Sequence, residues 1–456
     1  MYIIIGGAGD AGLHLGRILS KKGHEIAFID SNPEALNKAR EIDSLVVEGD
    51  VSDHRVLLQA GINNCDFYIG LVKDDSANLV SCALADFYGC RTIARVKSAS
   101  LIKEPLSRRY TPIGVDIVLC PSLIVSHQIS RIFSFPSKLS RTKKYKIDSY
   151  RAKVEDDSSC ANKRISTLRL PKGARIVSVF RGINHILPDD SFILRPEDEI
   201  SLFVDERIKT IQRIQRILGS EVRPLKEAKN VFIAGATEIG INIAEELLEA
   251  KSSVVIMDLS KKRAKQASEK LVKAQIIQAD PLGHGVLVKE EIEKFDVLFS
   301  VGTSLERNIF LSVLAKRFNI PNATALINRI DLKESIEGTL VDSAIIPNLL
   351  LVNTILNILK GQKSPRSSKK KRMLRIKDLQ TEEIVLKQIK VTRKVRCANK
   401  KVGTLSPELG NFLIAGIVKD DKGFVPSDDY TISVGDTIFV LYHKSSEKAL
   451  NRWFIG

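Results

Sequence analysis

Residues 2–19 read YIIIGGAGDAGLHLGRIL, which combines a short apolar run, a glycine-rich turn and the start of an apolar helical pattern. The glycines at Gly7, Gly9 and Gly12 have the G-x-G-x-x-G spacing of a dinucleotide-binding strand, turn and helix. In such a turn the first glycine permits the tight bend, the second lets the backbone approach a pyrophosphate, and the third lets the helix pack on the strand. The stretch therefore predicts a parallel α/β sheet with a nucleotide at the carboxyl ends of its strands.

This stretch occurs twice in the chain. VFIAGATEIGINIAEELL begins at Val231, and its Gly240 lies 228 residues after Gly12. A different unit also recurs, because CANKRISTL, from Cys160, returns as CANKKVGTL, from Cys397. Since self-similarity at a fixed spacing indicates duplicated units, the chain has the order A–B–A′–B′, with a larger and a smaller domain each present twice.

The two kinds of unit differ in their predicted secondary structure. In each A unit short apolar runs alternate with helical patterns, which predicts a Rossmann-like parallel sheet with right-handed crossovers and helices on both faces. Each B unit has short strands, Pro-x-Asp turns and a terminal helix or tail, which predicts a small α+β lobe. The predicted domains are two Rossmann-like domains at 1–135 and 228–360 and two small lobes at 143–219 and 374–456.

One apolar helical segment follows the last strand of each A unit. The two segments lie at 120–135 and 346–359 and carry too few polar residues for a solvated face. Each is either a crossover or dimerisation helix or an ordinary packing helix of its sheet.

Composition narrows the possible functions. The chain has 456 residues, 44% hydrophobic and 27% charged, as in folded soluble domains. The most apolar stretch is interrupted by proline and asparagine, so we expect no membrane span, and the first residues do not have the pattern of a signal peptide. The six cysteines have no metal-binding spacing, which favours buried thiols in a reducing cytosol.

The net charge of +16 suits an anionic partner, which is a nucleic acid, a membrane surface or a phosphate ligand. Part of the excess lies at 363–377, a segment with eight basic residues and no acidic one. A DNA-binding regulator is one interpretation of this segment, and a solvated linker or a contact with anionic lipid is another. With an aromatic fraction of only 6% and no zinc knuckle, we expect no nucleic-acid partner.

The first nucleotide cleft is predicted at successive strand ends. Asp30 ends the second strand, where a carboxylate binds the hydroxyls of an adenosine ribose and disfavours a 2′-phosphate, so NAD(H) is preferred over NADP. Cationic side chains at later strand ends are candidates for phosphate contacts, although a solvated loop charge is the alternative for each. The other candidate residues are Gly7, Ala8, Gly9, Asp10, Ala11, Gly12, Asp50, Lys73, Arg95 and Lys97.

The second copy of the turn is altered. Thr237 stands in place of the middle glycine, so its Cβ crowds a pyrophosphate, and Glu238 adds negative charge. Asp258 retains the acid at the end of the second strand, whereas Arg95 has no clear counterpart. The second cleft is therefore a weaker candidate, formed by Gly235, Ala236, Thr237, Glu238, Ile239 and Asp258.

More specific motifs accompany the glycine turn. They are Asp75-x-x-Asn78 after the fourth strand, Ile93-Ala94-Arg95-Val96, and Asp116-x-x-x-x-Pro121 where the chain leaves the sheet. Together with the tandem order they resemble the TrkA family of Trk potassium-uptake regulatory subunits, over nearly the whole chain. That family has two RCK domains per chain, each a Rossmann-like lobe followed by a small TrkA-C lobe.

The resemblance implies a cytoplasmic regulator, peripheral on the inner face of the cell membrane and docked on a potassium-translocating subunit of the TrkH, TrkG or KtrB kind. It also implies binding of NAD(H), with ATP and ADP at the same cleft, and assembly into a homo-oligomeric ring such as a tetramer. By motif it adds Val72 beside Lys73 to the first cleft, and Thr303 and Asn328 to the second.

An NAD-dependent oxidoreductase is the rival hypothesis. Such an enzyme needs an acid–base group beside the nicotinamide and a substrate domain. The seven histidines are scattered, none recurs in the duplication, and the chain has no Walker A lysine. We therefore predict a binding switch without catalytic residues or a metal site, which gates a membrane partner through a ligand-dependent conformational change.

Overall fold

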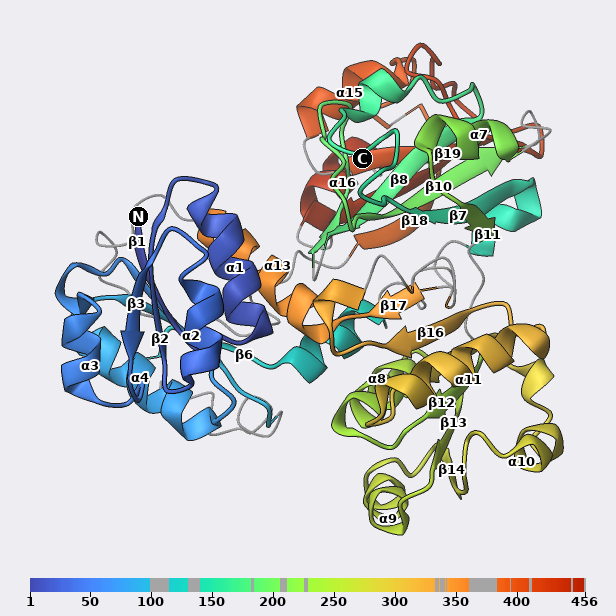
Figure 1. Ribbon diagram of the computed structural model, residues 1–456. Coiled ribbons are helices and arrows are strands. Elements are labelled where there is room, and N and C mark those ends of the chain that lie inside the picture. Colours follow the sequence, from blue (N-terminus) through green and yellow to red (C-terminus); the bar gives the residue numbers. More distant parts are fainter. Residues whose placement is uncertain are drawn as a thin grey trace. The chain divides into compact units, whose positions relative to one another are not determined.

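Figure 1 shows the computed structural model of the chain. The structure describes residues 1–98, 115–129, 140–181, 184–205, 211–224, 229–332, 336, 341, 343–360, 384–393, 395–409, 412–443 and 446–454. The chain divides into two compact units, and each contains segments far apart in the sequence. One unit consists of Met1–Ser130 and Lys229–Leu379, and the other of Arg131–Ala228 and Gln380–Gly456.

The first unit begins with a six-stranded parallel sheet in the order β3-β2-β1-β4-β5-β6, drawn mainly in blue in Figure 1. Its central residues, such as Ile4 and Ile5, are fully buried, as expected for a sheet covered on both faces. The order reverses between β1 and β4, which is where open α/β sheets bind ligands. The elements are β1 (Tyr2–Gly6), α1 (Asp10–Ser20), β2 (Glu25–Asp30), α2 (Pro33–Ala39), β3 (Leu45–Glu48), α3 (His54–Gln59), β4 (Phe67–Gly70), α4 (Asp75–Phe87), β5 (Arg91–Arg95) and β6 (Ile117–Leu119).

The same unit contains a second parallel sheet with the equivalent order β14-β13-β12-β15-β16-β17. The predicted duplication of an α/β domain is therefore confirmed at the level of strand order. The elements are β12 (Asn230–Ala234), α8 (Glu238–Glu249), β13 (Ser253–Asp258), α9 (Lys261–Lys270), β14 (Gln275–Gln278), α10 (His284–Lys289), β15 (Val297–Ser300), α11 (Leu305–Arg317), β16 (Ala323–Leu326), β17 (Ser343–Ile345) and α13 (Pro347–Lys360).

The helices that follow the last strands connect the two α/β lobes. Residues 121–129 are helical, and Ser122 Oγ accepts a hydrogen bond from Asn242 Nδ2 of α8 at 3.2 Å. Nearby, His127 Nδ1 lies 3.0 Å from Glu246 Oε1, also on α8. In the reverse direction, α13 of the second lobe contacts α1 of the first. Each of these segments thus packs on the first helix of the other lobe, which favours the crossover interpretation.

The second unit contains two antiparallel sheets, one from each small lobe, in the orders β11-β7-β10-β8-β9 and β18-β21-β19-β20. Their inner faces share a core in which Val177 and Phe203 pack with Leu413 and Phe439. The elements are β7 (Ile147–Lys153), β8 (Ala174–Arg181), β9 (Asn184–Ile186), β10 (Glu199–Asp205), α7 (Gln212–Leu218), β11 (Val222–Pro224), β18 (Ile384–Lys390), α15 (Val402–Leu409), β19 (Phe412–Lys419), β20 (Lys422–Phe424), β21 (Thr437–His443) and α16 (Glu447–Phe454).

A buried carboxylate closes the polar turn before β10. Asp198 is fully buried and accepts hydrogen bonds from Arg181 Nε and Nη2, at 2.7 and 2.6 Å, and from the backbone N–H of Arg195 at 2.8 Å. Burial raises the pKa of Asp198, and the hydrogen bonds from Arg181 oppose that shift. Because Arg181 makes both side-chain hydrogen bonds to this buried carboxylate, loss of Arg181 should destabilise the lobe.

Two expectations from composition concern burial and membranes. All six cysteines are free and buried, as predicted. No helix in the described parts of the chain is long and apolar enough to cross a membrane. The basic segment 363–377 lies outside the described residues.

Candidate nucleotide-binding site

Two glycines of the first turn are required by the fold itself. Gly7 has φ +113°, and a Cβ there would lie 2.9 Å from the backbone of Leu71 and Val72. A Cβ on Gly12 would lie 2.0 Å from the carbonyl oxygen of Gly7. Any side chain at these positions forces α1 away from β1 and β4, so both glycines are explained without a ligand.

Gly9 is different, because nothing in the described part of the chain requires a glycine there. It is the N-cap of α1 with φ −76° and ψ −175°, a conformation open to any residue. A Cβ at this position would have no atom of the described residues within 4 Å. In the second copy Thr237 has nearly the same conformation, with φ −74° and ψ 171°. Glycine at position 9 therefore leaves open space above the N-terminus of α1, where backbone N–H groups bind anions.

Asp30 lies at the end of β2, beside this turn. Its Oδ2 accepts the N–H of Ala8 at 2.7 Å, and its Oδ1 accepts the N–H of Asn32 at 2.9 Å. No other donor within the described part of the chain reaches this carboxylate. Because each carboxylate oxygen can accept two hydrogen bonds, one position on each oxygen is left for a ligand such as a ribose diol.

Asn78 fixes the carboxyl edge of β4 and β5. It is buried, its Nδ2 donates to the carbonyls of Val72 and Arg95 at 2.9 Å each, and its Oδ1 accepts the N–H of Val72 at 3.0 Å. The sequence motif marked Asn78 but not this role. One buried amide therefore holds the strand end that carries Arg95 against the strand end that faces Gly7.

Arg95 is a cation without a full set of partners. Its Nε is buried and has no hydrogen-bond partner among the described residues. Burial lowers the pKa of Arg95, and the carboxylate of Asp75 partly offsets that effect. A buried guanidinium N–H that is left unpaired is costly, which makes an anionic ligand at this position favourable.

The remaining predicted residues of the first cleft lie around this centre. Asp50 follows β3 next to Asp30, since the N–H of Gly49 bonds to the Asp30 carbonyl at 3.0 Å. Hydrogen bonds from Ser52 lower the pKa of Asp50 and already use its Oδ1. The other residues divide by exposure: Ala11 is buried, whereas Asp10, Lys73 and Lys97 are exposed.

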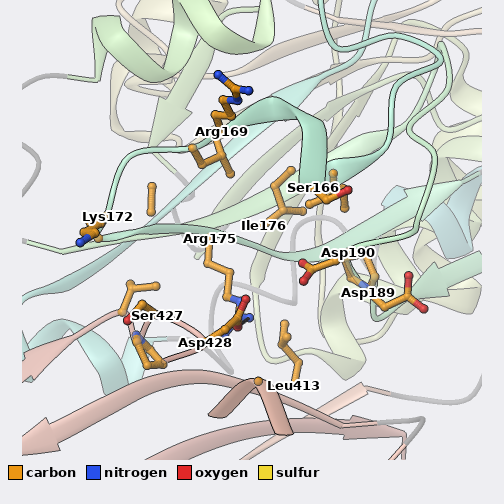
Figure 2. A pocket seen from close by; sticks show the side chains of 18 of the residues that line it. Ser166, Arg169, Lys172, Arg175, Ile176, Asp189, Asp190, Leu413, Ser427 and Asp428 are labelled. Atoms are coloured by element: carbon orange, nitrogen blue, oxygen red, sulfur yellow. Dashed lines mark hydrogen bonds and ion pairs between the residues drawn. The ribbon is translucent and has the colours of Figure 1, made fainter. Parts of the chain in front are cut away.

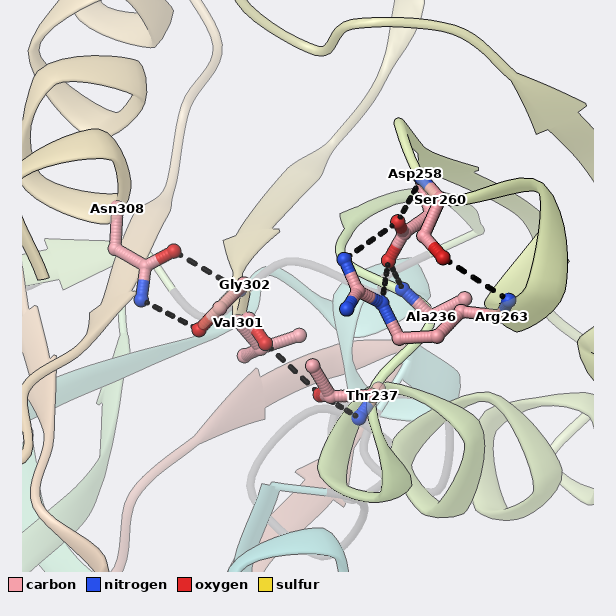
Figure 3. Close-up of polar contacts among 9 residues, drawn as sticks. Ala236, Thr237, Asp258, Ser260, Arg263, Val301, Gly302 and Asn308 are labelled. Carbon is pink, nitrogen blue, oxygen red and sulfur yellow. Dashed lines mark hydrogen bonds and ion pairs between the residues drawn. The ribbon is translucent and has the colours of Figure 1, made fainter. Parts of the chain in front are cut away.

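The second cleft has the same frame but different contacts (Figure 3). Gly235 again has a positive φ, of +117°, and Asn308 repeats the contacts of Asn78 on the carbonyls of Gly302 and Leu326. Thr237 is tied down, because its Oγ1 donates to the Val301 carbonyl at 2.8 Å. Of the other predicted residues, Ala236 is buried, Ile239 is half-buried, and Glu238 and Thr303 are exposed.

Arg263 is the residue that sequence reasoning missed in this second cleft. Its Nε and Nη2 each lie 2.8 Å from an oxygen of Asp258. Burial raises the pKa of Asp258, but hydrogen bonds from Arg263 and two backbone N–H groups outweigh it, and the pKa lies below its ordinary value. The sequence did contain a signal for this contact. Arg263 lies in the first turn of α9, the helix after β13, at the position where the first copy has Ala35.

A cavity of about 850 Å³ lies within the second unit (Figure 2). Its charged lining includes three cations and three carboxylates, from Arg169, Lys172, Arg175, Asp189, Asp190 and Asp428. Arg175 Nη2 and Asp428 Oδ1 are only 2.6 Å apart and neutralise each other. The balanced charge of this cavity selects neither an anion nor a cation.

Comparison with protein-family profiles shows which kinds of domain the chain contains. The profile of the TrkA-N domain matches residues 3–121 and 231–347, and that of the TrkA-C domain matches 150–219 and 386–455. The chain belongs to the TrkA family. TrkA proteins are non-enzymatic regulatory proteins with RCK domains, so the oxidoreductase hypothesis is not supported.

Curated relatives match this chain over most or all of its length. A Trk system potassium uptake protein TrkA homolog of Archaeoglobus fulgidus is 26% identical over 96% of this chain and 97% of its own. The Trk system potassium uptake protein TrkA homolog 1 of Methanosarcina mazei is 24% identical over all of both chains. The Trk system potassium uptake protein TrkA of Haemophilus influenzae is 28% identical over 78% of each.

Solved structures with the same fold include the GsuK RCK domain. It has a TM-score of 0.53 and 17% identity, covering 99% of this chain and 94% of the solved one. A GsuK channel bound to NAD has a TM-score of 0.53 and 16% identity, covering 99% of this chain and 78% of the channel. At these identities the likeness concerns the fold of this chain alone.

Proposed function

We propose that the chain is a cytoplasmic, peripheral regulatory subunit that binds NAD(H) in its first cleft and gates a potassium-translocating membrane subunit of the TrkH, TrkG or KtrB kind. ATP and ADP are alternative ligands of the same cleft. The proposal also includes assembly into a homo-oligomeric ring and the four domain boundaries given above. The potassium-uptake names of the full-length relatives and the NAD bound to the GsuK channel support it.

The observation that carries the proposal is the open space at Gly9. The backbone conformation does not need a glycine here, and a Cβ would meet no described residue. A ligand that approaches the backbone at this point explains the glycine. The turn lies at the N-terminus of the eleven-residue helix α1, whose N–H groups favour a phosphate.

The surrounding residues fit a dinucleotide. Within the described part of the chain, Asp30 keeps one acceptor position open on each oxygen for the adenosine ribose hydroxyls. Arg95 offers a phosphate oxygen a buried N–H that has no partner among the described residues. When bound, NAD(H) supplies the charge and length that link these positions, and no catalytic step is required of the chain.

The lobe contacts suggest how occupancy is transmitted. The glycine turn opens α1, and α1 packs against α13 of the other α/β lobe. A ligand that holds the N-terminus of α1 therefore biases the arrangement of the two lobes, provided that it binds the alternative arrangements with different affinity. A tenfold preference corresponds to about 1.4 kcal/mol per site, and a ring of subunits adds several such terms.

The decisive variant is Gly9→Thr, which gives the first copy the residue of the second. Because position 9 accepts any residue and a Cβ meets nothing, we expect an unchanged unfolding transition. We expect NADH affinity, measured by calorimetric titration, to fall at least tenfold. Potassium uptake by cells that express the chain with its transporter should lose its dependence on nucleotide.

Gly285→Thr is the matched control, because a Cβ on Gly285 also meets open space but lies in α10 of the other lobe. It should leave NADH binding and uptake unchanged. NADH binding to the Gly9→Thr variant as tight as to the wild type would refute the assignment of the cleft. Pull-down of the transporter that does not respond to NADH, ATP or ADP would refute the gating role.

A further inference from the structure

The carboxylate of Asp258 in the second cleft is saturated by donors of its own chain. Its Oδ2 accepts the N–H of Ala236 at 2.7 Å, and its Oδ1 accepts the N–H of Ser260 at 2.7 Å. Arg263 then places Nε 2.8 Å from Oδ2 and Nη2 2.8 Å from Oδ1. Each oxygen thus has two donors, which fills the acceptor capacity of the carboxylate.

The first cleft shows what Arg263 replaces. Asp30 accepts the equivalent two backbone N–H groups, from Ala8 and Asn32, and no described arginine contacts it. The residue five positions after Asp30 is Ala35, whereas the residue five positions after Asp258 is Arg263. The guanidinium of Arg263 presents two parallel N–H groups, as a ribose presents two O–H groups. It takes the two acceptor positions of Asp258 that correspond to those left open on Asp30.

A second arginine acts at the same edge of the sheet. Arg307, in the first turn of α11, forms an ion pair with Asp280, which follows β14. The strand order places β13 and β12, whose carboxyl ends form the cleft, between β14 and β15. The pair therefore joins the two sides of the cleft, and the corresponding position in the first copy, Ala77, carries no charge.

We propose that Arg263 occupies the place of the adenosine ribose in the second cleft, so that this cleft is filled from within and the chain binds one dinucleotide. The inference rests on the proposed function of the first cleft. Thr237 adds to the effect, because its side chain is fixed against the Val301 carbonyl beside the phosphate position. The second α/β lobe is then a structural copy, which receives the signal through its contacts with α1.

Calorimetric titration of the full-length chain with NADH tests this stoichiometry. We expect one NADH per chain, no binding to an Asp30→Asn variant, and unchanged binding to Asp258→Asn. Two NADH per chain, or a tenfold weaker affinity in Asp258→Asn, would overturn the inference. No binding to the wild type would instead refute the proposed function, so the two failures are distinguishable.

A gain-of-binding variant tests the role of the arginine. The double substitution Thr237→Gly and Arg263→Ala clears both obstacles while Asp258 stays in place, so a second NADH should bind per chain. Lys262→Ala, at the exposed neighbouring position, is the matched control and should leave one. A stoichiometry that stays at one NADH per chain in the double variant would overturn the role of Arg263. Binding of a second equivalent of nucleotide by the wild type when the nucleotide is NADPH would overturn it as well.

Discussion

Replacing Asn78 by aspartate tests whether one buried amide holds the carboxyl edge of the first sheet together. Asn78 is 1% exposed, and its Nδ2 donates to the carbonyls of Val72 and Arg95 at 2.9 Å each. Aspartate has the same shape but places an oxygen at this position. Two carbonyls then lose their donor at a cost of about 1–3 kcal/mol each, so the free energy of unfolding should fall by about 2–6 kcal/mol.

Urea denaturation of the full chain, followed by circular dichroism, measures this loss against a total stability of about 5–15 kcal/mol for a typical domain. Asn308→Asp is the matched control, because Nδ2 of Asn308 donates to the carbonyls of Gly302 and Leu326 at 3.1 Å each. We expect a similar loss of stability in both variants. NADH affinity should fall at least tenfold only in Asn78→Asp, where Arg95 loses its anchor.

Two results would refute this reasoning. A change below about 0.5 kcal/mol in Asn78→Asp, the size of a surface substitution, would mean that the amide does not hold the two strand ends. An equal loss of NADH affinity in Asn308→Asp would mean that the ligand does not distinguish the two clefts.

Three other experiments test the fold and its electrostatics. Gly12→Ala places a Cβ 2.0 Å from the Gly7 carbonyl oxygen, so the free energy of unfolding in urea should fall by about 1–3 kcal/mol; an unchanged midpoint would contradict the close approach of α1. Arg181→Ala leaves the buried carboxylate of Asp198 without its cation, so the small lobe should lose about 3–5 kcal/mol, and Asp198→Asn in that background should recover part of it. The pKa of Asp258 is lowered, so its carboxylate contributes stability above the unfolded-state value of about 3.9, and that contribution disappears as the pH falls through the lower folded-state pKa. The stability difference between the wild type and Asp258→Asn should therefore shrink below about pH 4, and a difference independent of pH would contradict the ion pair.

The sequence predicted the α/β lobes well because their signals are local. A glycine turn between an apolar strand and a helix forms within about 20 residues, and strand order follows from right-handed crossovers. The repeat then extended the prediction to the second lobe. The roles of Gly7, Gly9 and Gly12 were predicted one by one, and the structure separates the two that the fold requires from the one that it leaves open.

The sequence did not predict which segments form one unit. The two α/β lobes belong to one compact unit and the two small lobes to another, although they alternate along the chain. Such pairing depends on complementary apolar surfaces, such as the core that Val177 and Phe203 share with Leu413 and Phe439. A hydrophobic pattern shows that a face is buried but not against which partner.

The sequence by itself determined a duplicated α/β chain with one intact and one altered dinucleotide turn, because residue type at fixed spacing decides backbone conformation. Only the tertiary structure decided what fills the second cleft. By sequence pattern alone, Arg263 is an ordinary helix residue. Its bidentate contact with Asp258 exists because β13 and α9 bring the two side chains together. Side-chain pairing across a turn depends on direction and distance, which a one-dimensional pattern does not contain.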